Sequence, residues 1–140
     1  MKNCSIQLKG KHDLTSLNFA SLAEERMTTV ANDGSRKLAF ATGSGGLSTS
    51  KLRSIYALIM NIYTKVDKPQ DYEDHRADLQ YLKVKMAYEA GREDVVKQFL
   101  EKTSLMSLID GVNDYDQFIL YCRYAESLVA YFKFYGGKEK

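Results

Sequence analysis

The sequence predicts an all-α fold, a single-domain bundle of about five helices. Apolar residues recur at spacings of three and four along most of the 140-residue chain, which is the period of an amphipathic helix. The chain contains only one proline, Pro69, and glycine or hydroxyl-bearing residues stand where the apolar stretches begin or end. No stretch favours a strand, so we expect none.

The first predicted helix covers residues 13–32 and follows a loose N-terminal tail, residues 1–12. Its apolar positions are Leu14, Leu17, Leu22, Ala23 and Met27. Residues 33–47 are expected to form a flexible, basic, Gly/Ser-rich linker before a helical core over residues 48–138. The glycines of this linker do not form a nucleotide-binding loop, because Gly-Lys-Ser/Thr is missing and no strand precedes them.

A second helix is predicted to begin near residue 48, with Ser48 or Thr49 as its N-cap. Its first turn carries Lys51 and Arg53, although the helix dipole disfavours cations there. No acidic residue lies between Asp33 and Asp67, whereas Arg36, Lys37, Lys51, Arg53 and Lys65 do. A helix N-terminus flanked by cations suits a phosphate group. Alternatively, Lys51 and Arg53 are two solvated cations that a well-packed helix tolerates.

The third predicted helix follows Pro69 and ends at Gly91 as its C-cap, with an inner stripe of Leu79, Leu82, Met86 and Ala90. Its opposite face aligns Tyr81, Lys85, Tyr88 and Arg92. Alternating rings and cations suit stacked bases and paired phosphates. Tyrosines at helical spacing also pack against neighbouring helices, so both interpretations remain open.

Two further helical regions complete the bundle. Residues 93–110 are amphipathic and break at Thr103-Ser104, and Asn113-Asp114 caps a last, aromatic-rich helix that ends at Gly136 in a left-handed C-cap. The inward side of this last helix is predicted to consist of Phe118, Tyr121, Cys122, Ala125, Leu128, Val129 and Phe132.

The composition offers no catalytic constellation, and we expect a protein that is not an enzyme and uses neither a metal nor another cofactor. His12 and His75 stand apart from any metal-ligand spacing, and Cys122 lies among apolar residues. The two cysteines form no CxxC pair, which indicates a reducing cytoplasm. No apolar run is long enough to span a membrane. The acidic run Asp67–Asp78 after the basic window indicates a polarised surface with a partner.

Three blocks of the chain resemble a known family. They are Leu47-Ser-Thr-Ser-Lys-Leu-Arg53, Leu82-Lys-Val-Lys-Met-Ala-Tyr-Glu-Ala-Gly-Arg92 and Tyr124-Ala-Glu-Ser-Leu-Val-Ala-Tyr-Phe-Lys-Phe-Tyr-Gly-Gly137. Together they resemble the small subunit of the type III-A CRISPR effector, the Csm complex, over roughly residues 47–138. Val84 and Ser48 depart mildly from the pattern, standing where many relatives have proline and threonine.

The resemblance implies a non-catalytic, cytoplasmic subunit present in several copies, stacked as an inner filament that contacts guide RNA, target RNA and the other subunits. Carried over by position, the RNA contacts would be Lys51, Arg53, Lys83, Lys85 and Arg92. The residue patterns add Arg36, Lys37, Tyr81 and Tyr88 as further RNA or subunit contacts. Recognition would be independent of sequence, because cations read the phosphate path while guide pairing supplies specificity.

A purely structural role is the alternative. In that case the tyrosine face and the acidic run dock neighbouring subunits, and basic helix ends meet the acidic run of the next copy. A helical DNA-binding regulator is disfavoured, because no helix-turn-helix spacing is recognisable.

Overall fold

The computed structural model describes residues 4–8, 13–42 and 45–137. Within them the chain is mainly helical, as expected, with six α-helices and two small two-stranded sheets. The α-helices are α1 Phe19–Met27, α2 Thr49–Tyr63, α3 Pro69–Asp74, α4 Arg76–Arg92, α5 Asp94–Thr103 and α6 Tyr115–Phe134, and a short 3₁₀ helix covers Ser107–Gly111. The strands are β1 Ser5–Ile6, β2 Leu14–Thr15, β3 Thr28–Val30 and β4 Arg36–Leu38.

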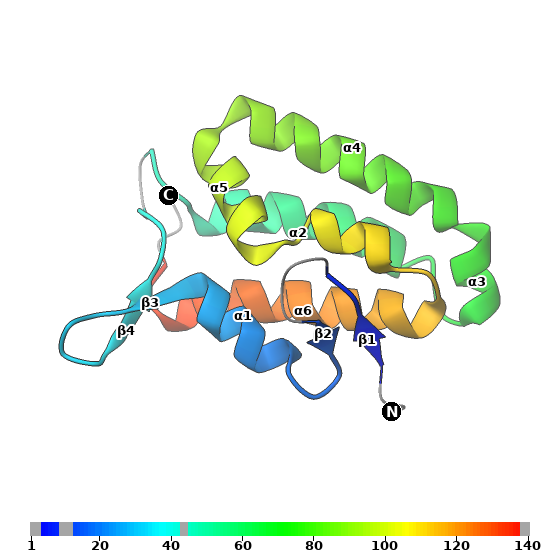
Figure 1. Ribbon diagram of the computed structural model, residues 1–140. Coiled ribbons are helices and arrows are strands. Elements are labelled where there is room, and N and C mark those ends of the chain that lie inside the picture. The colour runs from blue at the N-terminus through cyan, green and yellow to red at the C-terminus, as the bar shows by residue number, and fades with distance from the viewer. Residues whose placement is uncertain (1–3, 9–12, 43–44, 138–140) are drawn as a thin grey trace.

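The aromatic-rich helix α6 is the centre of the bundle. It packs against α1, α2 and α3, while α4 lies on the outside and contacts α2 and α5 (Figure 1). The seven residues that the sequence predicts on its inward side are buried, except for the half-buried Val129. Leu120 and Tyr124 are also fully buried, so α6 contributes apolar surface on more than one side.

The expectation of no strands is wrong for both ends of the first predicted helix. β1 pairs with β2, and β3 pairs with β4, each antiparallel. The amide of Thr15 donates to the side-chain oxygen of Asn18 at 2.7 Å, which holds a turn that delays the start of α1 until Phe19. Thr28, Thr29 and Val30 are β-branched and leave the helix as a strand, in line with their stiffness at χ1.

The predicted linker over residues 33–47 is wrong where β4 forms and where Phe40 and Leu47 enter the core. Phe40 packs edge-on against Phe99 of α5 at 5.9 Å between ring centroids. Residues 43–44 of that segment lie outside the described residues, as do residues 1–3 and 9–12 of the predicted tail.

The third predicted helix is two helices, α3 and α4, because the backbone of His75 leaves the helical region (φ −113°, ψ 14°). Gly91 is not its C-cap, since α4 continues to Arg92. The break at Thr103-Ser104 is confirmed, and Ser104 adopts a left-handed conformation at φ 61°. Asp114 caps α6, because its side chain accepts the amide of Gln117 at 2.8 Å.

Candidate nucleic-acid interface

The start of α2 is built around its N-cap, Ser48. The buried Ser48 hydroxyl accepts the main-chain amide of Lys51 at 3.2 Å, which satisfies one of the helix's free N–H groups. Before it, Gly46 lies so close to the main chain of Ala41 that a Cβ would meet the Ala41 carbonyl oxygen at 2.5 Å. The glycine therefore allows the chain to turn tightly into the helix.

The two cations in the first turn of α2 differ in their surroundings. The Lys51 ammonium donates to the carbonyl of Gly46 at 2.9 Å and forms an ion pair with the Glu93 carboxylate at 3.4 Å. Arg53 is exposed, and none of the residues described in the structure forms a hydrogen bond or ion pair with its guanidinium. Arg53 is thus open to an external anion, whereas Lys51 is already engaged within the chain.

The outer face of α4 carries the predicted alternation of rings and cations. Tyr81 and Tyr88 are 61% and 66% exposed. The Lys85 ammonium lies 4.9 Å from the centre of the Tyr81 ring, and the Arg92 guanidinium carbon lies 5.7 Å from that of Tyr88. Neither tyrosine is buried against a neighbouring helix of the same chain, so both rings are free to contact a partner.

Lys83 stands apart from that face. Its ammonium forms an ion pair with Asp110 at 2.8 Å, which ties α4 to the 3₁₀ helix. Of the remaining predicted cations, Arg36 donates to the Thr28 hydroxyl at 3.0 Å across the β3–β4 hairpin. Lys37 is exposed, and no partner is found for its ammonium within residues 4–8, 13–42 and 45–137.

The fold brings several of these cations to one end of the molecule. The start of α2, the end of α4 and the β3–β4 hairpin all lie there (Figure 1). The ion pair between Lys51 and Glu93 links the first of these segments to the residue that follows Arg92. Lys85 lies two turns back along α4, and Lys83 faces the 3₁₀ helix instead.

The opposite end of the bundle is acidic. It holds α3 and the start of α6 (Figure 1), and a shallow cleft there is lined in part by Glu73, Asp114 and Asp116. Asp67, Asp71 and Asp74 belong to the same end. The basic and acidic residues that the sequence showed as separate runs therefore lie at opposite ends of the axis of α2.

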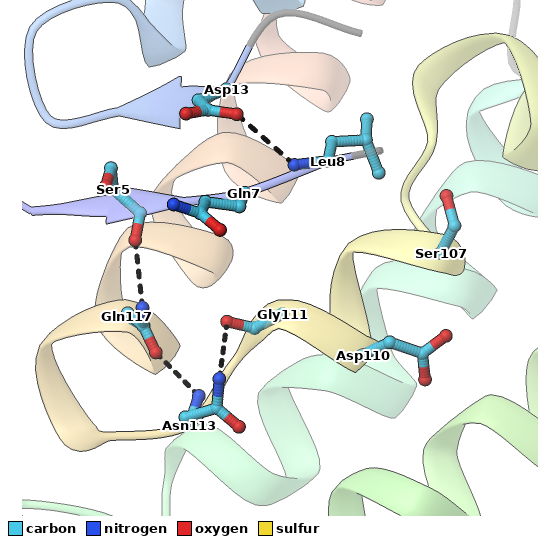
Figure 2. A pocket seen from close by; sticks show the side chains of 9 residues that line it. All are labelled: Ser5, Gln7, Leu8, Asp13, Ser107, Asp110, Gly111, Asn113 and Gln117. Atoms are coloured by element: carbon cyan, nitrogen blue, oxygen red, sulfur yellow. Dashed lines mark hydrogen bonds between the residues drawn. The ribbon is translucent and has the colours of Figure 1, made fainter. Parts of the chain in front are cut away.

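A polar cleft lies between β1, the 3₁₀ helix and the start of α6 (Figure 2). Its groups are largely occupied with one another: the Gln117 side chain donates to the carbonyl of Ser5 at 2.9 Å, and its oxygen accepts the amide of Asn113 at 2.6 Å. Asp110 is paired with Lys83. Among the described residues, the lining of this cleft includes no histidine or cysteine.

Cys122 and His75 have defined surroundings within the fold. Burial raises the pKa of the Cys122 thiol far above its usual value, which disfavours the reactive thiolate. His75 contacts Asp78 at 2.9 Å, and His12 lies outside the described residues. Within the part of the chain that the structure describes, His, Cys, Asp and Glu form no group of three or more suited to a metal ion. None of the described helices has the length and apolar character needed to cross a membrane.

The sequence patterns did not indicate that Glu93 lies beside the first turn of α2. It lies 42 positions after Lys51, and no local pattern connects the two residues. Only the packing of α4 and α5 against α2 brings the carboxylate to the first turn of α2.

Comparison with known proteins gives consistent matches. A family model described as Csm2 Type III-A matches residues 24–138. A protein of Enterococcus italicus named CRISPR system Cms protein Csm2 is 45% identical over 130 residues, covering 88% of this chain and 91% of that protein. Two proteins with the same name also match. The one from Streptococcus thermophilus is 34% identical and covers 90% of this chain and 98% of that protein. The one from Mycobacterium tuberculosis is 33% identical and covers 67% of this chain and 79% of that protein.

Proposed function

The chain belongs to the Csm2 family of type III-A, and from this membership we propose that it is the non-catalytic small subunit of a type III-A CRISPR RNA-guided complex. In this role several copies line up as an inner filament and hold guide and target RNA through the phosphate backbone, as part of antiviral defence in the cytoplasm. The partners are the RNA strands, the other subunits of the complex and further copies of the chain.

The observation that carries the RNA contact is the exposed Arg53 in the first turn of α2, whose guanidinium has no partner among the described residues. A cation at that position opposes the helix dipole, and its cost is recovered when an anion binds between it and the helix N-terminus. Arg92 and Lys85 extend the cationic track along α4, and Tyr81 and Tyr88 add rings on which bases can stack. Arg36 and Lys37 stand at the same end of the molecule.

Lys51 and Lys83 are weaker members of this set, because each ammonium already pairs with a carboxylate of the same chain. An RNA phosphate has to displace Glu93 or Asp110 before it can pair with either lysine. Arg92 also pairs with a carboxylate, that of Glu89 at 3.6 Å, but its side chain is 61% exposed. We therefore assign the main electrostatic contribution to Arg53, Lys85 and Arg92. One copy need not bind tightly, since successive copies along one strand act as a multivalent ligand.

The experiment compares Arg53→Ala with Lys65→Ala, each of which removes one exposed cation. Arg53 lies in the first turn of α2, and Lys65 lies just past its last residue. We expect Arg53→Ala to lower the affinity for single-stranded RNA and for a guide–target duplex, and to reduce the salt slope by about one. Lys65, at the acidic end of α2, serves as the matched control and should leave both unchanged. Equal losses in the two variants would remove the start of α2 from the RNA interface.

The structural adaptor is the second candidate, and the charge separation between the two ends favours it. A cationic end that meets the acidic end of the next copy is a heterologous contact, and such contacts build open filaments. This role requires stacking that depends on protein concentration and persists without RNA. Light scattering on RNA-free protein, with Asp71→Asn/Asp74→Asn as the disrupting variant, separates it from RNA-templated assembly.

A further inference from the structure

The C-terminal end of α6 carries an exposed aromatic ring. Phe134, the last residue of the helix, is 75% exposed, the largest fraction for any aromatic side chain that the structure describes. It follows the buried Phe132 by two positions, which is a rotation of about 200° and places it on the side of α6 away from the core. The ring therefore contributes little to the packing of its own domain.

Two tyrosine rings support Phe134 on the surface. Its ring centroid lies 5.0 Å from that of Tyr135 and 6.4 Å from that of Tyr131, with interplanar angles of 88° and 89°. Both tyrosines are half-buried. Edge-to-face contacts of this kind are a geometry that aromatic pairs prefer. They hold the Phe134 ring in place and leave most of it open to solvent.

Tyr135 is in turn fixed to α1. Its hydroxyl donates a hydrogen bond to the Glu24 carboxylate, which raises the pKa of the Tyr135 hydroxyl, while the positive charge of Arg36 opposes this rise. The charge of Arg36 therefore lies within electrostatic range of the same ring. We call Tyr131, Phe134 and Tyr135 the three-ring cluster. Because the cluster is anchored, its rings lose little freedom when a partner binds.

The three-ring cluster lies at the cationic end of the molecule. The end of α6 stands beside the β3–β4 hairpin, which carries Arg36 and Lys37, and at the same end as the first turn of α2 (Figure 1). The cluster itself does not suit a phosphate, because the C-terminus of α6 is the negative pole of the helix dipole and Glu24 adds a negative charge. A nucleobase is uncharged and has an aromatic face, so it is the part of a nucleic-acid strand that fits the ring.

We propose that Phe134 is a stacking platform for one unpaired base of an RNA strand whose phosphates are held by the cations at this end. The inference rests on the proposed RNA contact of Arg53 and adds a contact with a base to it. A base inside a duplex is covered on both faces by its neighbours, so the platform takes a base that lies outside a duplex. Stacking tolerates all four bases, which keeps recognition independent of sequence.

The test is fluorescence anisotropy of the full chain with two strands of equal length and charge, an oligoadenylate and an abasic RNA strand. The abasic strand has the same phosphates and no bases. Phe134→Ala should weaken binding of the oligoadenylate about five-fold or more and leave the affinity for the abasic strand unchanged. The salt slope should remain that of wild type, because no cation is lost. Arg53→Ala is the comparison, since it should weaken both strands and lower the slope.

Tryptophan fluorescence gives a direct signal of stacking, because the chain contains no tryptophan of its own. Phe134→Trp keeps a ring at the platform, so it should bind the oligoadenylate at least as well as wild type. Its fluorescence should fall as a base stacks on the indole, and the abasic strand should leave it unchanged. Tyr63→Trp, at the partly exposed last residue of α2, is the matched control and should keep its fluorescence with both strands.

The outcomes separate this inference from the function on which it rests. Equal affinities of wild type and Phe134→Ala for the oligoadenylate overturn the platform and leave the Arg53 contact standing. The same holds if the oligoadenylate does not change the fluorescence of Phe134→Trp. A loss that Phe134→Ala shows equally for both strands also overturns the platform and assigns the ring to folding or to a protein contact. A wild-type protein that binds neither strand overturns both proposals.

Discussion

The hydroxyl group of Tyr124 in α6 donates a hydrogen bond of 2.5 Å to the main-chain carbonyl of Thr103, the last residue of α5. The Arg26 guanidinium of α1 donates to both of these oxygens, at 3.1 and 3.3 Å. One residue past the left-handed Ser104, the carbonyl of Leu105 accepts the Tyr121 hydroxyl at 2.6 Å. Two buried tyrosines thus satisfy the carbonyls on both sides of a strained turn.

The first prediction concerns these hydroxyl groups. Tyr121→Phe should lower the free energy of unfolding by about 1–3 kcal/mol, because the buried Leu105 carbonyl loses the hydrogen bond from the Tyr121 hydroxyl. Tyr124→Phe should cost less, since Arg26 still donates to Thr103. Urea denaturation measures both. Tyr63→Phe, at a partly exposed tyrosine of α2, is the control and should change stability by less than about 0.5 kcal/mol.

The second prediction is a loss of stability in alkali. Burial raises the pKa of Tyr121 well above its ordinary value of 10, and burial also raises the pKa of Tyr124, with Arg26 opposing. The folded state therefore holds protons that the unfolded state releases once the pH exceeds about 10. This contribution to stability is complete below that pH and is lost as the pH rises above it.

We expect the free energy of unfolding to decline above about pH 10, and to decline less steeply for Tyr121→Phe than for wild type. Denaturation curves at several alkaline pH values test this difference. Parallel declines for the two proteins would show that other groups set the alkaline limit.

The end of α6 shows how far sequence reasoning reaches. A glycine pair after an apolar stripe predicted a left-handed cap, and Gly136 has φ 89°. The amides of Gly136 and Gly137 donate to the carbonyls of Lys133 and Phe132 at 3.0 and 2.8 Å, which is the Schellman arrangement. This motif is local, so the residues that form it are adjacent in sequence.

The third prediction uses three glycines with different surroundings. Gly137→Ala should be the most destabilising, because a Cβ there collides with the buried ring of Phe132. Gly136→Ala should cost about 1 kcal/mol through backbone strain alone, since no atom lies within 4 Å of its Cβ position. Gly91→Ala, in the last turn of α4, should stabilise by up to about 0.5–1 kcal/mol. Thermal unfolding ranks the three, and a Gly137→Ala protein as stable as wild type would contradict the packing argument.

Long-range pairing marks the limit of sequence reasoning. The helices were predictable because their apolar periods are local, whereas β1 and β2 are two-residue strands without a measurable alternation. The same limit holds at the candidate site. Lys51 and Arg53 look equivalent in sequence, and only the packing of Glu93 against Lys51 separates them.

The fourth prediction follows from that pair. Glu93→Gln should leave the Lys51 ammonium free for a phosphate and so raise the affinity for single-stranded RNA about two- to five-fold, the range expected for a partly exposed ion pair. The loss of folding stability should stay below about 1 kcal/mol for the same reason.

Glu101→Gln removes the same charge from an exposed position on α5 and is the matched control. Fluorescence anisotropy measures both variants, alone and with Lys51→Ala. In the Lys51→Ala background Glu93→Gln should have no effect, because the cation that the carboxylate occupies is gone. An equal gain from Glu101→Gln would instead assign the effect to the overall charge of the protein.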